Sequence, residues 1–154
     1  MKNNRIALKV LAAALLTCSA GFAAAAGTQS LAVTANVQGI CKFSAASTPL
    51  AFGSIDPSLT VDKVMTANVL YRCTKGTVSL GVTATGGLTR TMAGPTVTDT
   101  LGYTLALASD TQTGTGFGPG KDLTMVVTGT ITPAQFQNVS SGAYSENVTL
   151  NITP

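Results

Sequence analysis

The chain has 154 residues, with nine Lys and Arg against six Asp and Glu, and it contains neither His nor Trp. A hydrolytic triad would lack its general base, a zinc site would have no His ligand, and the acids are scattered singly along the chain. The composition therefore argues against an enzyme, a metal centre and a cofactor.

Residues 1–26 have the pattern of a secretory signal peptide. Lys2, Arg5 and Lys9 precede a short apolar run, and the sequence GFAAAAG then offers small residues for cleavage. We predict an exported protein whose mature chain begins at residue 27, with cleavage after Ala24 or Ala25 as the alternatives. Removal of the signal leaves six basic and six acidic side chains. A formally neutral chain argues against nucleic acid as a partner.

Residues 28–38, TQSLAVTANVQ, alternate as a half-buried strand does. Leu31, Val33, Ala35 and Val37 share one face of this strand. Two interpretations stay open at this point. The segment is either the first strand of its own domain or a strand that completes the sheet of another copy.

Two of the three cysteines belong to the predicted mature chain, because Cys18 leaves with the signal. In an exported protein, Cys41 and Cys73 predict one disulfide, with two buried free thiols as the alternative. Closing a loop of about 33 residues would stabilise the fold by roughly 3 to 4 kcal/mol in the chain-entropy model.

Short strand signals with turn residues between them occupy most of the remaining chain. No segment has the sustained 3.6-residue apolar period of a helix, so we predict an all-β fold, an antiparallel sandwich. The Gly-rich sequence GTGFGPGK lacks the order of a phosphate-binding loop and is read as a hairpin loop. The predicted strands cover residues 50–53, 64–73, 77–84, 101–107 and 122–131.

The last predicted strand carries Tyr144, Glu146, Val148, Leu150 and Ile152 on one mostly apolar face. Such a strand needs neighbours on both edges, and no later strand supplies one. A subunit that lends its first strand to the next copy would fill this place. Because the contact is head-to-tail, its natural product is an open fibre.

Three sequence motifs, in this order and spacing, resemble the spore coat protein U domain family, which includes the pilin subunits of archaic chaperone-usher pili. They are GICKFSAASTPLAFGSIDP, YRCTKG and ITPAQFQNVSSGAYSENVTLNI. The resemblance covers residues 38–154. It implies an incomplete immunoglobulin-like sandwich that is completed by a donor strand from another chain, with Cys41 and Cys73 as the family's disulfide pair.

The resemblance also implies a division of the chain into a signal peptide (1–26), a donor strand (27–38) and a pilin domain (39–154). The side chains that would enter the groove of the next subunit are those of Leu31, Val33, Ala35 and Val37. The strand beside the donor would present Tyr144, Val148, Leu150 and Ile152.

The partners implied by the resemblance are identical subunits in a head-to-tail fibre, a periplasmic chaperone and an outer-membrane usher. The chain would pass through the periplasm into a cell-surface pilus that supports attachment and biofilm formation. With no second domain, a shaft subunit is favoured over a tip adhesin. The alternative is a self-sufficient secreted β-sandwich binding module, while a small secreted hydrolase is disfavoured by the absence of His.

Overall fold

The computed structural model describes residues 27–154, and the predicted signal peptide, residues 1–26, lies outside the described residues. The chain divides into a segment that ends at Ala35 and a compact unit from Asn36 to Pro154. Residues 27–35 belong to no helix or strand, and their side chains are exposed. Among residues 27–154, no helix has the length and apolar character that crossing a membrane requires.

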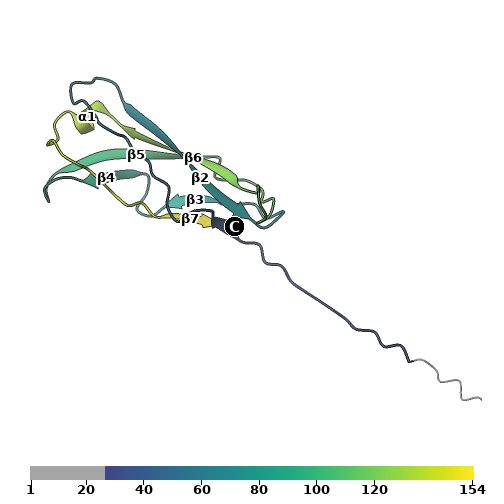
Figure 1. Ribbon diagram of the computed structural model, residues 1–154. Coiled ribbons are helices and arrows are strands. Elements are labelled where there is room, and N and C mark those ends of the chain that lie inside the picture. The colour runs from purple at the N-terminus through teal and green to yellow at the C-terminus, as the bar shows by residue number, and fades with distance from the viewer. Residues whose placement is uncertain (1–26) are drawn as a thin grey trace, which may run out of the picture. The chain divides into compact units, whose positions relative to one another are not determined.

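The larger sheet of the compact unit has five antiparallel strands in the order β1-β2-β6-β5-β4. Its two longest neighbours, β2 and β6, pair from Lys63 opposite Ile131 to Tyr71 opposite Leu123. Figure 1 shows these strands running side by side through the domain. The strands are β1 (Cys41–Phe43), β2 (Lys63–Cys73), β4 (Thr89–Ala93), β5 (Thr100–Ala108) and β6 (Leu123–Ile131).

A second, two-stranded sheet consists of β3 (Gly81–Ala84) and β7 (Leu150–Thr153), with Val82 opposite Ile152. One turn of helix, α1 (Pro133–Phe136), follows β6 and buries Phe136. Both sheets contribute side chains to one core, so the prediction of an all-β sandwich is confirmed.

The core follows from the two-residue period of the long strands. In β2, Val69, Tyr71 and Cys73 point inward, whereas Leu70 points to solvent. β5 and β6 repeat this alternation. The buried hydrophobic residues are Phe52, Val69, Tyr71, Cys73, Val82, Leu101, Tyr103, Leu105, Met125, Val127, Ile131 and Phe136.

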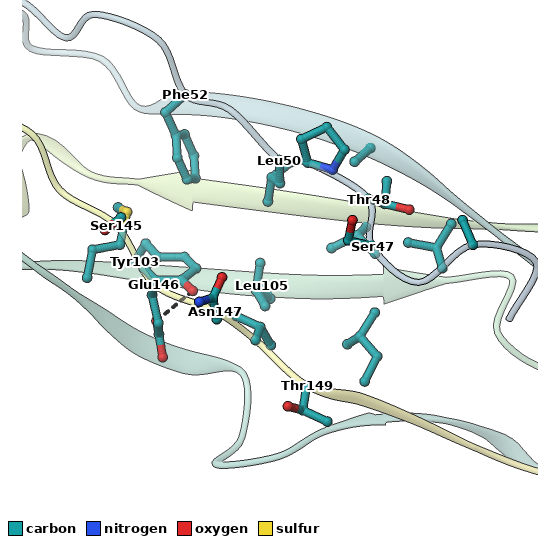
Figure 2. Close-up of a pocket in the computed structure, with 18 of the residues that line it drawn as sticks. Ser47, Thr48, Leu50, Phe52, Tyr103, Leu105, Ser145, Glu146, Asn147 and Thr149 are labelled. Atoms are coloured by element: carbon teal, nitrogen blue, oxygen red, sulfur yellow. Dashed lines mark hydrogen bonds between the residues drawn. The ribbon is translucent and has the colours of Figure 1, made fainter.

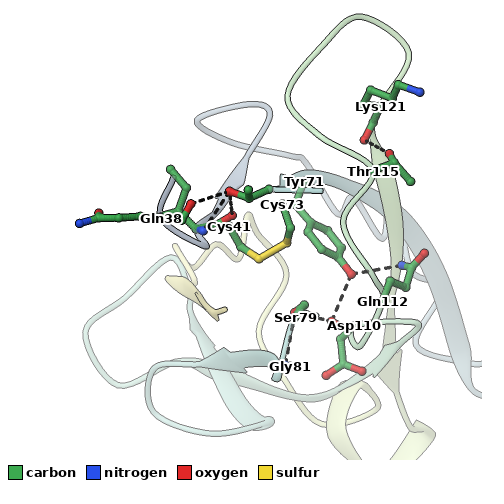
Figure 3. Close-up of a disulfide and its surroundings, with 12 residues drawn as sticks. Gln38, Cys41, Tyr71, Cys73, Ser79, Gly81, Asp110, Gln112, Thr115 and Lys121 are labelled. Atoms are coloured by element: carbon green, nitrogen blue, oxygen red, sulfur yellow. Dashed lines mark hydrogen bonds between the residues drawn. A yellow bond between two sulfur atoms is a disulfide. The ribbon is translucent and has the colours of Figure 1, made fainter. Parts of the chain in front are cut away.

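The predicted disulfide is present and joins Cys41 to Cys73. These residues are register partners, the first of β1 and the last of β2. Figure 3 shows the bond beside Tyr71, whose hydroxyl donates to the backbone oxygen of Asp110 at 3.2 Å. The fully buried Ser79 donates to the same oxygen at 2.8 Å. These two hydrogen bonds hold the loop after β5 against the core.

The chain just before β1 is fastened to the turn that follows β2. The Thr74 hydroxyl donates to the backbone oxygen of Gln38 at 3.0 Å and accepts from the Ile40 amide at 3.1 Å. A Cβ on Gly39 would lie 2.8 Å from the Thr77 hydroxyl, so a larger residue here would force the Thr77 side chain to move. We call residues 38–41 the root, because residues 28–38 lead into them.

Several strand predictions need correction. Residues 50–53 form no strand, because Leu50 and Phe52 pack onto the sheet and their backbone pairs with no neighbour among the described residues. Only residues 81–84 of the predicted strand 77–84 are in a strand, since its earlier part forms a single bridge from Val78 to Thr113. The short elements β1, β4 and α1 were not predicted.

The final strand is also shorter than predicted. β7 begins at Leu150, so Tyr144 and Val148 precede it in an extended but largely unpaired segment. Within the described chain, backbone hydrogen bonds join this segment to the rest of the domain only near its ends, at Ser145 and Thr149. A strand assignment requires a continuous ladder, which residues 146–148 lack on both sides.

Candidate functional site

An open groove of about 880 Å³ lies on the inner face of the five-stranded sheet. Its two walls are residues 43–50 with Phe52, and residues 144–150. Figure 2 shows Tyr103 and Leu105 of β5 lying between these walls. The floor is formed by Ala67, Val69, Met92, Tyr103, Leu105 and Val127.

The first wall rests on a glycine of β6. A Cβ on Gly129 would lie 2.7 Å from both the Leu50 and Phe52 side chains, so only glycine lets this wall approach β6 so closely. The Phe52 ring meets the Tyr103 ring edge-on, with centroids 6.1 Å apart. Packing onto the floor therefore replaces strand pairing as the force that places this wall.

An ion pair holds the start of the same wall. Arg72 donates two hydrogen bonds of 2.8 Å to the Asp122 carboxylate, which also accepts from the Ser44 hydroxyl. The hydrogen bonds from Arg72 and then from Ser44 lower the pKa of Asp122 to about 2. Arg72 also donates to the backbone oxygen of Phe117 at 3.1 Å, which ties the Gly-rich loop to the wall.

The second wall begins with a tyrosine that is fixed by its own hydroxyl. Tyr144 donates to the backbone oxygen of Ser140 at 2.7 Å, and its ring packs so closely on Gly94 that a Cβ there would collide with it. A tyrosine bonded to the backbone a few residues upstream is a tyrosine corner, a device of immunoglobulin-like sandwiches. Next along the wall, Ser145 and Ala93 exchange two backbone hydrogen bonds of 3.0 Å.

Glu146 anchors the middle of the second wall to the sheet. Its carboxylate pairs with Arg90 of β4 and accepts a hydrogen bond of 2.7 Å from the Tyr103 hydroxyl. Burial, and then the hydrogen bond to Glu146, raise the pKa of Tyr103 to about 12. Burial also tends to raise the pKa of Glu146, but the hydrogen bonds from Arg90 and Tyr103 outweigh it, and the net pKa is lowered. This carboxylate is held in an ion pair with Arg90.

Both walls present backbone groups that pair with nothing in the described chain. Residues 45–52 make no backbone hydrogen bond there, and neither do residues 146–148. β7 pairs with β3 on one edge only. Unpaired amide and carbonyl groups on an extended edge are the groups to which an added strand can bond.

The structure brings part of the predicted acceptor set together. Tyr144, Val148 and Leu150 line the groove, whereas Ile152 packs against the core without lining it. The predicted donor residues belong to no helix or strand, and the exposed fractions are 84% for Leu31, 83% for Val33 and 80% for Val37. Ala35 is exposed as well.

Sequence reasoning missed the floor and the whole first wall. The alternation in residues 101–107 placed Tyr103 and Leu105 on one face of a strand, but it does not tell a covered position from an open one. Residues 43–50 carry little regular pattern. In the described part of the chain, no three His, Cys, Asp or Glu side chains are grouped so that they could hold a metal ion.

Fold and site together define a β-sandwich with an open groove between two unpaired backbone edges. The sequence matches the Spore Coat Protein U domain over residues 27–151, and the chain belongs to this family. The domain is associated with subunits of chaperone-usher fimbriae, which are usually exported. Neither curated proteins nor solved structures gave a match.

Proposed function

We propose that this protein is the repeating subunit of a surface fibre that grows head to tail. Residues 28–38 of one copy enter the groove of the next as an additional strand. The observation that carries the proposal is the pair of unpaired backbone edges on either side of an apolar floor. A small ligand would leave these backbone groups unsatisfied, whereas an extended peptide bonds to them directly.

The donor segment supplies what the groove lacks. Burying Leu31, Val33 and Val37, which are exposed, gains about 1.5 to 3 kcal/mol each, or roughly 5 to 9 kcal/mol before ordering costs. Each backbone hydrogen bond adds about 0.5 to 1.5 kcal/mol net. The donor side chains that would enter the groove, from position 31 to position 37, lie two residues apart. The partly buried side chains of the second wall, from position 144 to position 150, have the same spacing.

The same exposed surfaces explain why partners are needed before assembly. An empty groove and a free apolar strand would pair indiscriminately during export. A periplasmic chaperone that lends a strand would protect the groove, and an outer-membrane usher would exchange that strand for the donor of the next subunit. The finished shaft would lie on the cell surface and support attachment and biofilm formation.

A matched pair of substitutions in the donor tests the proposal. Val33→Asp puts a charge on the face that enters the groove, whereas Thr34→Asp puts the same charge on the opposite face of the same strand. Burial of an unpaired carboxylate is costly, so the first variant is expected to form no fibre and the second to polymerise. Electron microscopy and sedimentation of the exported proteins give the readout.

A mixing experiment establishes the direction of the contact. The Val33→Asp variant keeps an intact groove, so it should still accept residues 28–38 from a wild-type copy and end the fibre there. Fibres should therefore shorten in proportion to the amount of variant added. Normal fibre length at a tenfold excess of Val33→Asp, or fibres made of this variant alone, would show that another surface mediates assembly.

A further inference from the structure

The three methionines of the described chain differ in their access to solvent. Met65 on β2 is 37% exposed, and Met125 on β6 is 0% exposed. Met92 on β4 is partly buried, and it lines the groove. Only Met92 therefore has an environment that changes when a strand fills the groove.

Met92 lies where the floor of the groove meets the second wall. Its neighbour Ala93 holds Ser145 by two backbone hydrogen bonds, and its register partner on β5 is the buried Leu101. Two residues before it, Arg90 is committed to Glu146 and to the backbone oxygen of Thr85. The thioether thus adds apolar surface at a point that an inserted strand must cover.

A thioether is open to a reaction that the other floor residues do not undergo. A peroxide transfers one oxygen atom to the sulfur, so that a sulfur–oxygen bond forms, the peroxide O–O bond breaks, and the peroxide is reduced to water or an alcohol. The sulfur is oxidised by two electrons to the sulfoxide. This group is polar and accepts hydrogen bonds, whereas the original thioether is apolar.

We propose that Met92 is an oxidation site that closes the groove to an incoming strand. In the empty groove the sulfoxide oxygen is hydrated, but beneath a strand it must lose that water, and such burial is costly without a donor. Peroxide would then inactivate unassembled subunits and spare assembled ones, in which the strand covers the sulfur. This inference rests on the proposed function.

The test measures strand binding before and after oxidation. The protein is the full exported chain carrying Val33→Asp, whose own donor is disabled, and the probe is a fluorescent peptide of residues 28–38. After treatment with hydrogen peroxide, the dissociation constant of the peptide should rise by about tenfold or more. Reduction by methionine sulfoxide reductases should restore it.

Two variants assign the effect to one sulfur. With Met92→Leu added, the affinity of that variant should be the same before and after peroxide, whatever its starting value. With Met65→Leu, the full loss should persist. Mass spectrometry should find that bound peptide slows oxidation at Met92 and leaves the rate at Met65 unchanged, with Met125 reacting slowest in both states.

The outcomes separate the two proposals. A peptide that binds the untreated and the oxidised chain equally well would overturn the role of Met92 and leave the strand-binding groove intact. A peptide that does not bind the untreated chain would overturn the proposed function, and the oxidation site would fall with it. Loss of binding that persists in Met92→Leu would assign the sensitivity to another residue and refute the inference.

Discussion

Replacing Cys41 and Cys73 together by alanine removes the covalent link between β1 and β2. The two residues are 32 positions apart in sequence, so the disulfide closes a loop of about 33 residues. In the chain-entropy model this closure stabilises the fold by about 4 kcal/mol. Cys73 is fully buried, so the cavity that the lost sulfur leaves there should increase the loss of stability by about 1 kcal/mol. Because small domains are stable by only about 5 to 15 kcal/mol, this variant should be close to unfolding.

Urea unfolding followed by circular dichroism gives the free energy of unfolding, with the slope m as a check on two-state behaviour. The wild-type chain reduced in dithiothreitol is the matched control, since it keeps both sulfur atoms and loses only the bond. It should lose most of the same stability, whereas the alanine variant should lose slightly more. A loss below about 1 kcal/mol in the reduced chain, with m unchanged, would refute the loop-closure reasoning.

Three further changes test the walls and the loops. Gly129→Ala should lower the free energy of unfolding by about 1 to 3 kcal/mol by pushing Leu50 and Phe52 off the floor. The control Gly118→Ala, whose added Cβ would meet only the Lys121 side chain at 3.9 Å, should change the free energy of unfolding in urea by less than about 0.5 kcal/mol. Equal costs would contradict the close packing of the first wall. Ser109 has a φ of 60°, a backbone conformation that is strained for a residue with a Cβ. Ser109→Gly should therefore raise the free energy of unfolding by about 0.5 to 1 kcal/mol, and a lower urea midpoint would show that Ser109 is not strained. The pKa of Asp122 is lowered from 3.8 to about 2, so its contribution is complete above about pH 4 and is lost as the pH falls toward 2. Asp122→Asn should flatten the pH dependence of thermal unfolding in that window, and an unchanged slope would show that the ion pair with Arg72 does not contribute.

The sequence predicted the parts of the fold that follow from periodicity. The run of strand-forming residues from Val64 to Cys73, closed by the turn sequence TKG, placed β2 within one residue of its observed bounds. The export signal and the cysteine count predicted the disulfide without knowledge of the fold. Both inferences depend on local pattern or on composition, and both of these can be read directly from the sequence.

What could not be predicted depends on contacts between distant segments. Residues 50–53 have the composition of a strand, yet their wall is placed by the absence of a side chain at Gly129, which lies on another strand. Glu146 was expected on the face of the last strand, but its partner Arg90 lies 56 positions away. An open groove in a sheet depends on segments that are far apart in the sequence, so the pattern of no single segment predicts it.

The fastening at the root has a mechanical consequence. Tension on a fibre would pull each subunit through residue 38, and β1, at three residues, is too short to resist peeling by its own hydrogen bonds. In the proposed fibre, Thr74 would take the first share of that load, and the disulfide at Cys41 would pass the rest to the end of β2. β2 has eleven residues and lies between β1 and β6. The disulfide would thereby transfer the load from a three-residue edge strand to the longest strand of the sheet.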